Sequence, residues 1–484
     1  MPTFTLSGFQ VTRNATDTVV AVDPLSLSVF VPEGQTTFSY SILGTEPDDI
    51  PEVDITSDAV SVIASGPGVP GGVAALPDDS LSFLGTVTTS TGTHTLLVFE
   101  VEQDDGSFLD AFFQIGGDPL AVPGSVTAFQ AIEDGVTQIG AATGAFAPGA
   151  TISFSSLANT TEEAGPNQVV GTDSDDVLPG TAGDDLIVTG NATPNGDQVD
   201  GSAGDDVIDM SGNDGVNGFV TLNYSALDSG IAVTIDGVAE TGTVNKGANG
   251  TDTLIGVEQP LFAGFGNGGL GVIGTSSADS FTLAPGANQW MQVRGGDGAD
   301  SYEISGDGLV RLDFASTGAT GGAQVNFATG AIADDGFGNA ETITGTSNVW
   351  EVRGTANADA ITGGAADESF ISRGGDDTID GGDGFDRLRY DRSGVGSASV
   401  DLAAGTATGS WDGVAFTNTI SNIEWVRGSN SADTLAGDTN ENRLDGRGGT
   451  DTFVHVGGND TIGDFDAATE TLIVRVAGLT QAQV

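Results

Sequence analysis

The sequence predicts an all-β protein in which a parallel β-solenoid follows an antiparallel β-sandwich. Two observations lead to this prediction. Short apolar runs of strand length fill the first third of the chain, and a nine-residue pattern recurs through the rest. No segment shows a convincing amphipathic-helix periodicity. We expect a β-sandwich domain over residues 1–158, a linker over 159–170, the solenoid over 171–475 and a C-terminal tail over 476–484.

Apolar runs alternate with turn-rich clusters in residues 1–158. The predicted strands are Phe4–Val11, Leu25–Val31, Thr37–Leu43, Leu96–Val101, Phe108–Ile115 and Thr151–Leu157. Short runs separated by turn residues are typical of an antiparallel sandwich. The stretch is long enough to bury a core of its own, and we expect it to fold without the rest of the chain. The polar segment that follows, ANTTEEAGPNQ, has the composition of a linker.

The nine-residue pattern is clearest at Gly381–Arg389, which reads GGDGFDRLR. It fits the template Gly-Gly-x-Gly-x-Asp-x-U-x, in which U is a large apolar residue. Stepping back in nines gives SRGGDDTID, GGAADESFI and GTANADAIT, so an acid at the sixth position and an apolar residue at the eighth hold their phase. The register returns from Gly428, from Gly171 and, less regularly, from Gly274. A phase held this long indicates a structural repeat, even in a chain with 75 glycines and 68 acidic residues.

The sixth-position acids are the candidate metal ligands of these repeats. They are Asp176, Asp185, Asp197, Asp206, Asp279, Asp300, Asp359, Asp377, Asp386, Asp433, Asp451 and Asp460. Glu368 and Asn442 hold the same position in two further units. Glycine permits the sharp turns, each turn exposes backbone carbonyls, and the acid adds a carboxylate. Oxygen ligands of this kind suit Ca²⁺, which takes six to eight oxygens, better than Mg²⁺. We therefore expect several Ca²⁺ ions in the turns, because solvation alone has no reason to keep a nine-residue phase.

These units resemble the nonapeptide repeats of the repeats-in-toxin (RTX), or haemolysin-type, calcium-binding family. The resemblance implies a parallel β-roll in which the first six positions of each unit bind Ca²⁺ and the eighth packs in the core. It also implies type I secretion, with folding on Ca²⁺ binding after export, so we expect an extracellular or cell-surface location. The first ten residues, MPTFTLSGFQ, lack the basic and apolar regions of a secretory signal. RTX metalloproteases are a poor match because no HExxH motif is present.

The segments between the repeat blocks resemble one another. They open at Leu222, Leu312 and Leu388 with LNYS, LDFA and LRYD. Each continues with a predicted strand, at Ile231–Ile235, Ala323–Phe327 and Ala398–Leu402. They close on DTLIGVE, ETITGTS and NTISNIE, which begin at Asp252, Glu341 and Asn418. We interpret these segments as wider coils of the same parallel solenoid, with their aromatic side chains in the core.

The net charge of −55 limits the possible partners. Such a charge destabilises a compact chain unless counter-ions bind. With 13 basic residues against 68 acids, nucleic acid is excluded as a partner because phosphate is repelled. The chain has no cysteine and therefore no disulfide. No apolar run is long enough to span a membrane.

The sequence contains no recognisable active site. His94 and His455 have no histidine partner at metal-ligand spacing, and neither a GxSxG motif nor a cysteine nucleophile is present. One local cluster, Arg387, Arg389, Tyr390, Asp391 and Arg392, has the residue types of an Asp/Arg/Tyr site in polysaccharide lyases or epimerases. We interpret it as a patch that balances charge.

Two functions stay open at this point. The first is a secreted, non-enzymatic Ca²⁺-binding protein with a structural or adhesive role at the cell surface or in the matrix, with self-association or a surface polysaccharide as its partner. The second is an extracellular protein that binds or modifies a polysaccharide. The lack of an active site favours the first.

Overall fold

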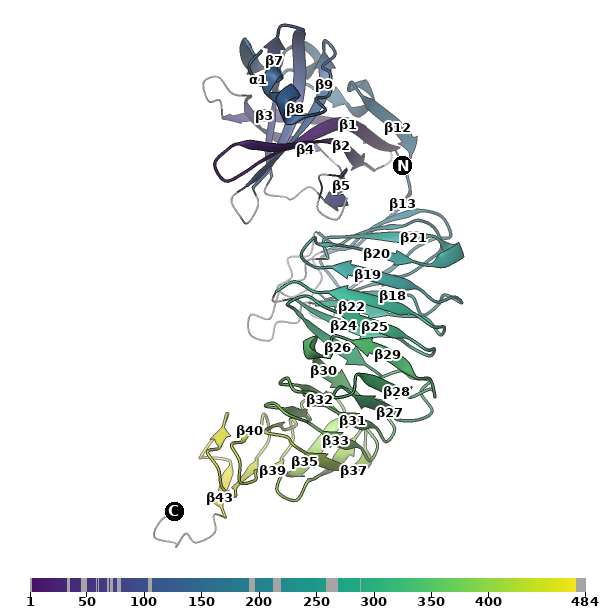
Figure 1. Ribbon diagram of the computed structural model, residues 1–484, viewed down its shortest axis with the longest axis vertical. Coiled ribbons are helices and arrows are strands. Elements are labelled where there is room, and N and C mark those ends of the chain that lie inside the picture. Colours follow the sequence, from purple (N-terminus) through teal and green to yellow (C-terminus); the bar gives the residue numbers. More distant parts are fainter. Residues whose placement is uncertain are drawn as a thin grey trace.

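A computed structural model describes residues 2–32, 35–44, 50–57, 59, 61–67, 69, 73–75, 80–102, 107–190, 196–211, 219–257, 269–287 and 289–475 (Figure 1). The predicted tail, residues 476–484, lies outside this set. The all-β prediction is confirmed, because strands dominate the described chain. They form an antiparallel sheet, sheet A, and two sheets that share the repeat region, sheets B and C. No helix in the described part is long and apolar enough to cross a bilayer.

Sheet A takes up the N-terminal part of the chain. Its strands are β1 (Pro2–Arg13), β2 (Val19–Phe30), β3 (Thr37–Gly44), β4 (Glu52–Ser57), β5 (Ser61–Ser65), β6 (Val73–Ala75), β7 (Leu81–Thr89), β8 (Gly92–Glu102), β9 (Phe108–Gly117), β10 (Gln138–Ala141), β11 (Ile152–Ser153) and β12 (Thr160–Ala164). They pair in the order β11-β3-β4-β7-β8-β9-β1-β2-β5-β6, with β10 on β7 and β12 on β1. The strands therefore form one continuous antiparallel sheet, where the sequence predicted the two sheets of a sandwich.

Sheet A differs from the sequence prediction at three points. The segment Thr151–Leu157 forms only the short β11 and the 3₁₀ turn η3 (Phe154–Ser156). The predicted linker carries β12, which pairs with β1, and the first strand of sheet B. A helix, α1 (Val126–Glu133), begins where the Ser125 hydroxyl accepts a hydrogen bond from the Ala128 N–H at 3.2 Å. This helix buries only Phe129, so its sequence shows no periodic apolar stripe.

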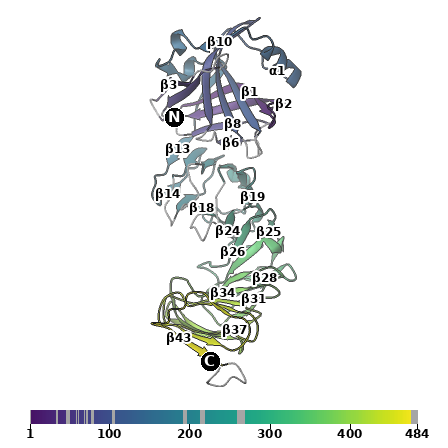
Figure 2. The same ribbon diagram turned by 90° about the vertical axis from the view of Figure 1, so that its left-hand side faces the viewer.

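The chain alternates between sheets B and C after residue 166. Sheet C contains β14 (Val177–Pro179), β16 (Asp197–Asp200), β18 (Phe219–Asn223), β22 (Gly269–Ile273), β24 (Trp290–Arg294), β26 (Leu309–Asp313), β30 (Val349–Arg353), β32 (Ser369–Ile371), β34 (Arg387–Arg389), β38 (Trp425–Arg427), β40 (Arg443–Asp445) and β42 (Thr461–Ile462). Every pairing in sheet C is parallel and joins strands in chain order. The strands stack along the long axis of the molecule (Figures 1 and 2).

Sheet B is larger and mixed. It contains β13 (Asn167–Val170), β15 (Asp185–Val188), β17 (Val207–Asp209), β19 (Ala232–Asp236), β20 (Thr241–Asn245), β21 (Thr251–Ile255), β23 (Ser280–Ala284), β25 (Ser301–Ile304), β27 (Ala323–Asn326), β28 (Ala331–Asp335), β29 (Glu341–Thr344), β31 (Ala360–Thr362), β33 (Thr378–Asp380), β35 (Val395–Asp401), β36 (Thr406–Trp411), β37 (Val414–Ser421), β39 (Thr434–Ala436), β41 (Thr452–His455) and β43 (Thr471–Val474). Three further 3₁₀ turns are η2 (Gly144–Phe146), η4 (Gly247–Asn249) and η5 (Thr346–Asn348).

The three predicted wider coils are antiparallel meanders within sheet B, which corrects the prediction of parallel coils. In the first, β19, β20 and β21 pair antiparallel, while β21 pairs parallel with β17 and β19 pairs parallel with β23. The order in space is therefore β17-β21-β20-β19-β23. The meanders β27–β29 and β35–β37 repeat this pattern. Each meander adds three strands to sheet B while sheet C gains one.

One apolar core joins sheets B and C along the repeat region. The eighth-position side chains of the nonads belong to it, as predicted, and all except the partly buried Ile462 are at most 5% exposed. Strand residues alternate between the two faces of a sheet, so the same register directs the sixth position and the eighth position to the inner side of each turn and strand.

Truncation of one eighth-position side chain tests this register. Ile379 is 0% exposed and pairs with Ile361 of the preceding coil. Ile379→Ala is expected to lower the free energy of unfolding by about 2–5 kcal/mol, because a large-to-small change leaves a cavity in a packed core. Denaturant unfolding measures the loss. The neighbouring surface change Thr378→Ala is the control, since Thr378 is exposed, and equal effects of both changes would contradict the register.

Sheet A packs on the first coils of the repeat region. Phe30 and Ile63 of sheet A form a buried cluster with Leu186 and Ile255 of sheet B. The Ser61 hydroxyl also donates a hydrogen bond to the Asp209 carboxylate. Sheet A therefore covers the N-terminal end of the stack, where an open sheet end would otherwise expose apolar residues.

Candidate metal centre: columns of buried carboxylates

The sixth-position acids lie at the start of the strands of sheets B and C, as the first residue of β15 and β16 and directly before the strand in the other units. Ten of the twelve predicted ligands are at most 3% exposed, and Asp176 and Asp460, near the two ends of the repeat region, are partly buried. Burial of this many carboxylates is costly unless each oxygen finds a donor or a counter-charge. The hydrogen-bond partners of each oxygen therefore indicate which carboxylates the protein satisfies without a bound cation.

Parallel register places the sixth-position acids of successive coils over one another. Ala360 pairs with Thr378, so the residues before them, Asp359 and Asp377, are neighbours in one column. The columns beside sheet B are Asp185–Asp206–Asp252, Asp279–Asp300–Glu341, Asp359–Asp377–Asn418 and Asp433–Asp451. Beside sheet C, similar columns join Asp176 to Asp197, Glu368 to Asp386, and Asn442 to Asp460.

One oxygen of each second member is used within its column. The backbone N–H of Asp359 donates to Oδ1 of Asp377 at 3.0 Å. The equivalent bonds run from Asp279 to Asp300 at 2.8 Å and from Asp433 to Asp451 at 2.8 Å. These bonds tie each coil to the next through the acid.

The second oxygen divides the acids into two classes. In the first class a Thr or Ser at position two of the nonad closes the turn. Thr355 donates to the Asp359 carboxylate from its backbone N–H at 2.9 Å and from its hydroxyl at 2.8 Å. The same closure joins Thr172 to Asp176, Thr181 to Asp185, Thr275 to Asp279 and Ser429 to Asp433. These turns satisfy their own carboxylates.

In the second class the second oxygen is buried without a hydrogen-bond partner among the described residues. These acids are Asp197, Asp300, Asp377, Asp386 and Asp451. Position two is glycine or arginine in the last four of these turns, so no hydroxyl is available to close them. A buried acceptor with no partner bears the full cost of desolvation.

Burial raises pKa values in both classes of turn. Burial raises the pKa of Asp377 to about 8 and that of Asp300 to about 7. Burial also raises the pKa of the self-closed Asp359, but only to about 6, because the bonds from Thr355 and Ala323 oppose it. The ionised carboxylates of Asp377 and Asp300 therefore need a positive charge more than that of Asp359 does.

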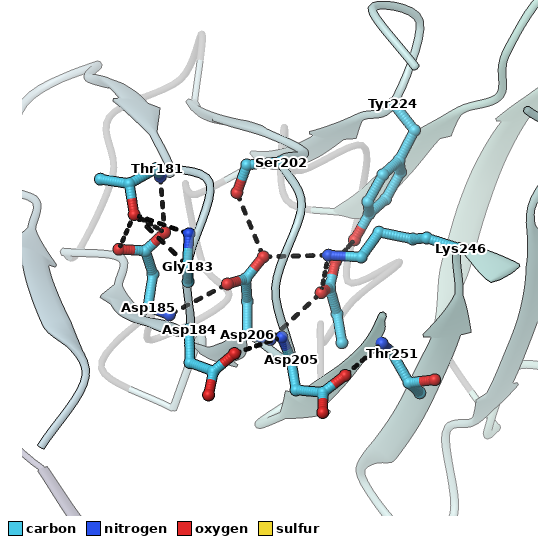
Figure 3. Close-up of polar contacts among 11 residues, drawn as sticks. Thr181, Gly183, Asp184, Asp185, Ser202, Asp205, Asp206, Tyr224, Lys246 and Thr251 are labelled. Atoms are coloured by element: carbon cyan, nitrogen blue, oxygen red, sulfur yellow. Dashed lines mark hydrogen bonds and ion pairs between the residues drawn. The ribbon is translucent and has the colours of Figure 1, made fainter. Parts of the chain in front are cut away.

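The first column already contains such a charge. Lys246, the only lysine in the chain, is fully buried, and its ammonium lies between Asp206 and Asp252 (Figure 3). The ammonium Nζ is 3.0 Å from Oδ2 of Asp206 and also binds Oδ1 of Asp252. The Tyr224 hydroxyl donates to the other Asp252 oxygen at 2.8 Å. An internal cation therefore completes this column.

The equivalent columns have no lysine. In the second column, Tyr302 donates to Oε1 of Glu341 at 3.3 Å, and the carboxyl groups of Glu341 and Asp300 interact with each other, so that a proton on one can bond the other. Burial and the Asp300 charge raise the pKa of Glu341 to about 9. In the third, the meander supplies the neutral Asn418 in place of an acid, and Oδ2 of Asp377 is unpartnered.

The column members supplied by the meanders were not among the predicted ligands. Asp252, Glu341 and Asn418 each begin a D/E/N-Thr-apolar triplet, which repeats positions six to eight of Asp377-Thr378-Ile379. This triplet is the signal that would have identified them. Lys246 has no such signal, because only the antiparallel pairing of β20 with β21 brings it back to the column.

The unpartnered oxygens fit a hard cation. Carboxylate oxygens at a turn are the donor type that Ca²⁺ prefers. Within the described ranges no three His, Asp or Glu side chains converge as a metal cluster. A cation at these turns would therefore have one or two carboxylates, and further oxygens from backbone or water.

The Arg387–Arg392 cluster does not form an open Asp/Arg/Tyr site. Tyr390 is 0% exposed and stacks on Phe416 in the core, with ring centroids 5.5 Å apart. Arg389 binds Asp391 through two bonds of 2.9 and 3.0 Å. Since the tyrosine cannot reach a glycan, the structure removes the one local candidate for an enzyme site. His94 is buried and His455 binds Asp460 at 2.5 Å.

No protein-family model matches the chain, and a comparison with curated proteins finds no match.

Proposed function

We propose that residues 171–475 form a Ca²⁺-stabilised β-roll of the RTX type. The observation that carries this proposal is that one carboxylate oxygen each of Asp197, Asp300, Asp377, Asp386 and Asp451 is buried and accepts no hydrogen bond from the residues that the structure describes. Each is placed at a turn by the nonad register, next to backbone groups of the neighbouring coil. Of the twelve predicted ligands these five are the primary ones, and the acids closed by Thr or Ser have a structural role.

A bound Ca²⁺ supplies two positive charges and accepts oxygen ligands at flexible geometry. At Asp377 it would satisfy the unpartnered oxygen and offset the repulsion from the neighbouring carboxylates. Several ions of this kind would also reduce the self-repulsion of a chain with a net charge of −55. Lys246 supports this interpretation, because its column needs a cation and contains one.

The biological role we propose is structural or adhesive, at the cell surface or in the extracellular matrix after type I secretion. The molecule is elongated, with the strands stacked along its length and sheet A at one end (Figure 2). Among the described residues, the opposite end of the stack is formed by β42 and β43, where Leu472 is 45% exposed and Phe465 is 38% exposed. Strand edges flanked by exposed apolar residues favour pairing with another chain, so we infer end-to-end self-association in Ca²⁺.

Titration calorimetry of the full chain tests the ion, with Mg²⁺ as the comparison. We expect several Ca²⁺ ions with dissociation constants of roughly 0.1–1 mM, the range of extracellular modules, and much weaker Mg²⁺ binding. Sedimentation and electron microscopy with and without Ca²⁺ test the assembly. Equal heats for both ions, or none for Ca²⁺, would contradict the proposal, and a strictly monomeric rod in Ca²⁺ would remove the assembly part alone.

Ca²⁺ affinity is expected to rise with pH. Burial raises the pKa of Asp377 from its ordinary value of 3.8 to about 8. Between these values the folded chain without Ca²⁺ holds a proton that the unfolded chain has released, so its stability falls as pH rises through this window. Ca²⁺ must displace that proton. Calorimetry at pH 5.5 and pH 8 in matched ionic strength should show tighter binding at pH 8, and no difference would contradict the burial of these ligands.

A further inference from the structure

The basic residues of this acidic chain are concentrated on one sheet. Seven consecutive strands of sheet C, from β24 to β40, carry seven of the 13 basic residues and three of the four tryptophans. They are Trp290, Arg294, Arg311, Trp350, Arg353, Arg387, Arg389, Trp425, Arg427 and Arg443. We call this set the Arg–Trp face.

The Arg–Trp face is the side of sheet C that points away from the core. The alternate residues of the same strands, including Val293, Leu312, Val352, Leu388, Val426 and Leu444, belong to the core between sheets B and C. Because side chains alternate along a strand, the arginines and tryptophans lie on the outer side. Trp411, the remaining tryptophan, is buried in the core.

Guanidinium and indole groups alternate across the Arg–Trp face. Arg311 lies 4.8 Å from the centroid of the Trp290 ring. Arg387 lies 5.3 Å from Trp350 and 4.7 Å from Trp425. Arg443 lies 4.3 Å from the centroid of a ring of Trp425. Stacking of this kind holds the planar guanidinium groups in fixed positions while leaving N–H donors at their edges.

The Arg–Trp face has more positive charge than its own acids neutralise. Asp313, Glu351 and Asp445 lie on these strands, and Asp391, just after β34, pairs with Arg389 and Arg427. Four acids therefore face seven arginines, which leaves three positive charges. Glu351 is fully buried and accepts bonds from Arg311 at 2.7 Å and Arg389 at 2.6 Å. Internal charge balance explains these pairs but not the excess. A local positive excess on a chain of −55 indicates an anionic partner.

The C-terminal end of the Arg–Trp face is hollowed. A pocket of about 360 Å³ lies there. Its polar lining consists of Arg427, Arg443, Arg447, Asn430, Asp445 and Asp464. This volume is within the usual range of small-ligand sites. With three arginines in its lining, the pocket suits one carboxylated sugar unit.

We propose that the Arg–Trp face binds an extended polysaccharide that carries carboxylates, a polyuronate. The arginine fork matches a carboxylate through two parallel bonds, and Arg389 already binds Asp391 in this way. Neighbouring strands lie about 4.8 Å apart, which is comparable to the length of one sugar unit. A glycan that crosses the strands would therefore meet partly exposed guanidinium groups on β24, β26 and β30 and again on β38 and β40. Between these two groups, β32 has no arginine and the arginines of β34 are 5% exposed, so they hold the tryptophans and acids of the face in place and do not contact the glycan. Duplex nucleic acid has a denser charge, and the acidic remainder of the chain would repel it more strongly.

The test uses the full chain in Ca²⁺ with polygalacturonate as the probe. Tryptophan fluorescence reports binding, since three of the four tryptophans lie on the Arg–Trp face. The variant is Arg353→Gln with Arg443→Gln, because these side chains are 29% and 44% exposed and are not core residues. Loss of their charge-assisted bonds should weaken binding by about tenfold or more. Arg475→Gln, an exposed arginine outside the face, is the matched control and should bind as the unchanged protein does.

Three results would overturn the proposal. Unchanged affinity of the double variant, with a circular dichroism spectrum like that of the parent, would show that the glycan is held elsewhere, for example through Ca²⁺ bridges to acidic turns. Equal binding of dextran would show that charge is not recognised. Tighter binding of dextran sulfate or single-stranded DNA than of polygalacturonate would replace the polyuronate with a sulfated or nucleic-acid partner.

Discussion

In a Ca²⁺ chelator the repeat region is expected to lose most of its β structure, and millimolar Ca²⁺ is expected to restore it. Five buried carboxylate oxygens have no partner in the described chain, and the net charge is −55. Without a cation, each unpartnered oxygen must either take up a proton or remain ionised in a site that has excluded water. The sum over several turns exceeds the small net stability of an ordinary domain.

Far-UV circular dichroism at pH 7.5, with chelator and then with Ca²⁺, measures this effect. Sheet A contains none of the nonads, so its signal should remain in chelator and provide the internal reference. Mg²⁺ at the same concentration is the second control, because it holds its waters more tightly. Identical β-rich spectra in chelator and in Ca²⁺ would contradict the expected role of the ion.

Replacement of the only lysine should also have a large effect. Lys246→Met removes the ammonium between Asp206 and Asp252, which are 1% and 0% exposed. Removal of one partner from a buried ion pair typically costs about 3–5 kcal/mol because the remaining charges are uncompensated. Methionine has a similar length, so the loss reports charge more than volume. Urea unfolding in saturating Ca²⁺ gives the free energy of unfolding.

A compensated variant separates charge from packing. Lys246→Met combined with Asp206→Asn and Asp252→Asn removes the unpaired charges and should recover a large part of the lost stability. A single change that costs less than about 1 kcal/mol, the value of an exposed pair, would contradict the internal-cation role of Lys246. A triple variant as unstable as the single one would attribute the loss to packing.

The repeat register was predictable from the sequence because it depends on local spacing. An apolar residue two places after the acid is buried in nearly every nonad, from Leu178 to Phe453. The meanders were not predictable in full. Their strands were found, but the turn between β19 and β20, Gly237-Val238-Ala239-Glu240, places Glu240 at the positive-φ position that Gly330 and Gly405 occupy in the other two meanders. Strand β12 in the predicted linker was missed because it forms by pairing with β1, which is distant in sequence.

The site was predictable in position but not in chemistry. All twelve acids were identified by phase, yet the difference between Asp359 and Asp377 depends on the residue at position two, Thr355 or Arg373, and on bonds that only the folded turn makes. The Arg–Trp face had no local signal either. Its arginines are spread along the sequence from Arg294 to Arg443, and only the parallel register of sheet C brings them together.

Ca²⁺ titration calorimetry of Asp377→Asn and Asp386→Asn tests the central claim most directly, which is that cations bind at turns whose acid has an unpartnered oxygen. Asparagine keeps the shape and removes the charge. Each change should weaken Ca²⁺ binding at its site by at least about tenfold. Substitution of residues that only support a metal ligand already costs about this much affinity, so loss of a ligand should cost no less. Asp383→Asn, at an exposed third position, should have almost no effect, and Asp359→Asn, closed by Thr355, should have a smaller one. Equal losses in all four variants, or none in any, would contradict the account.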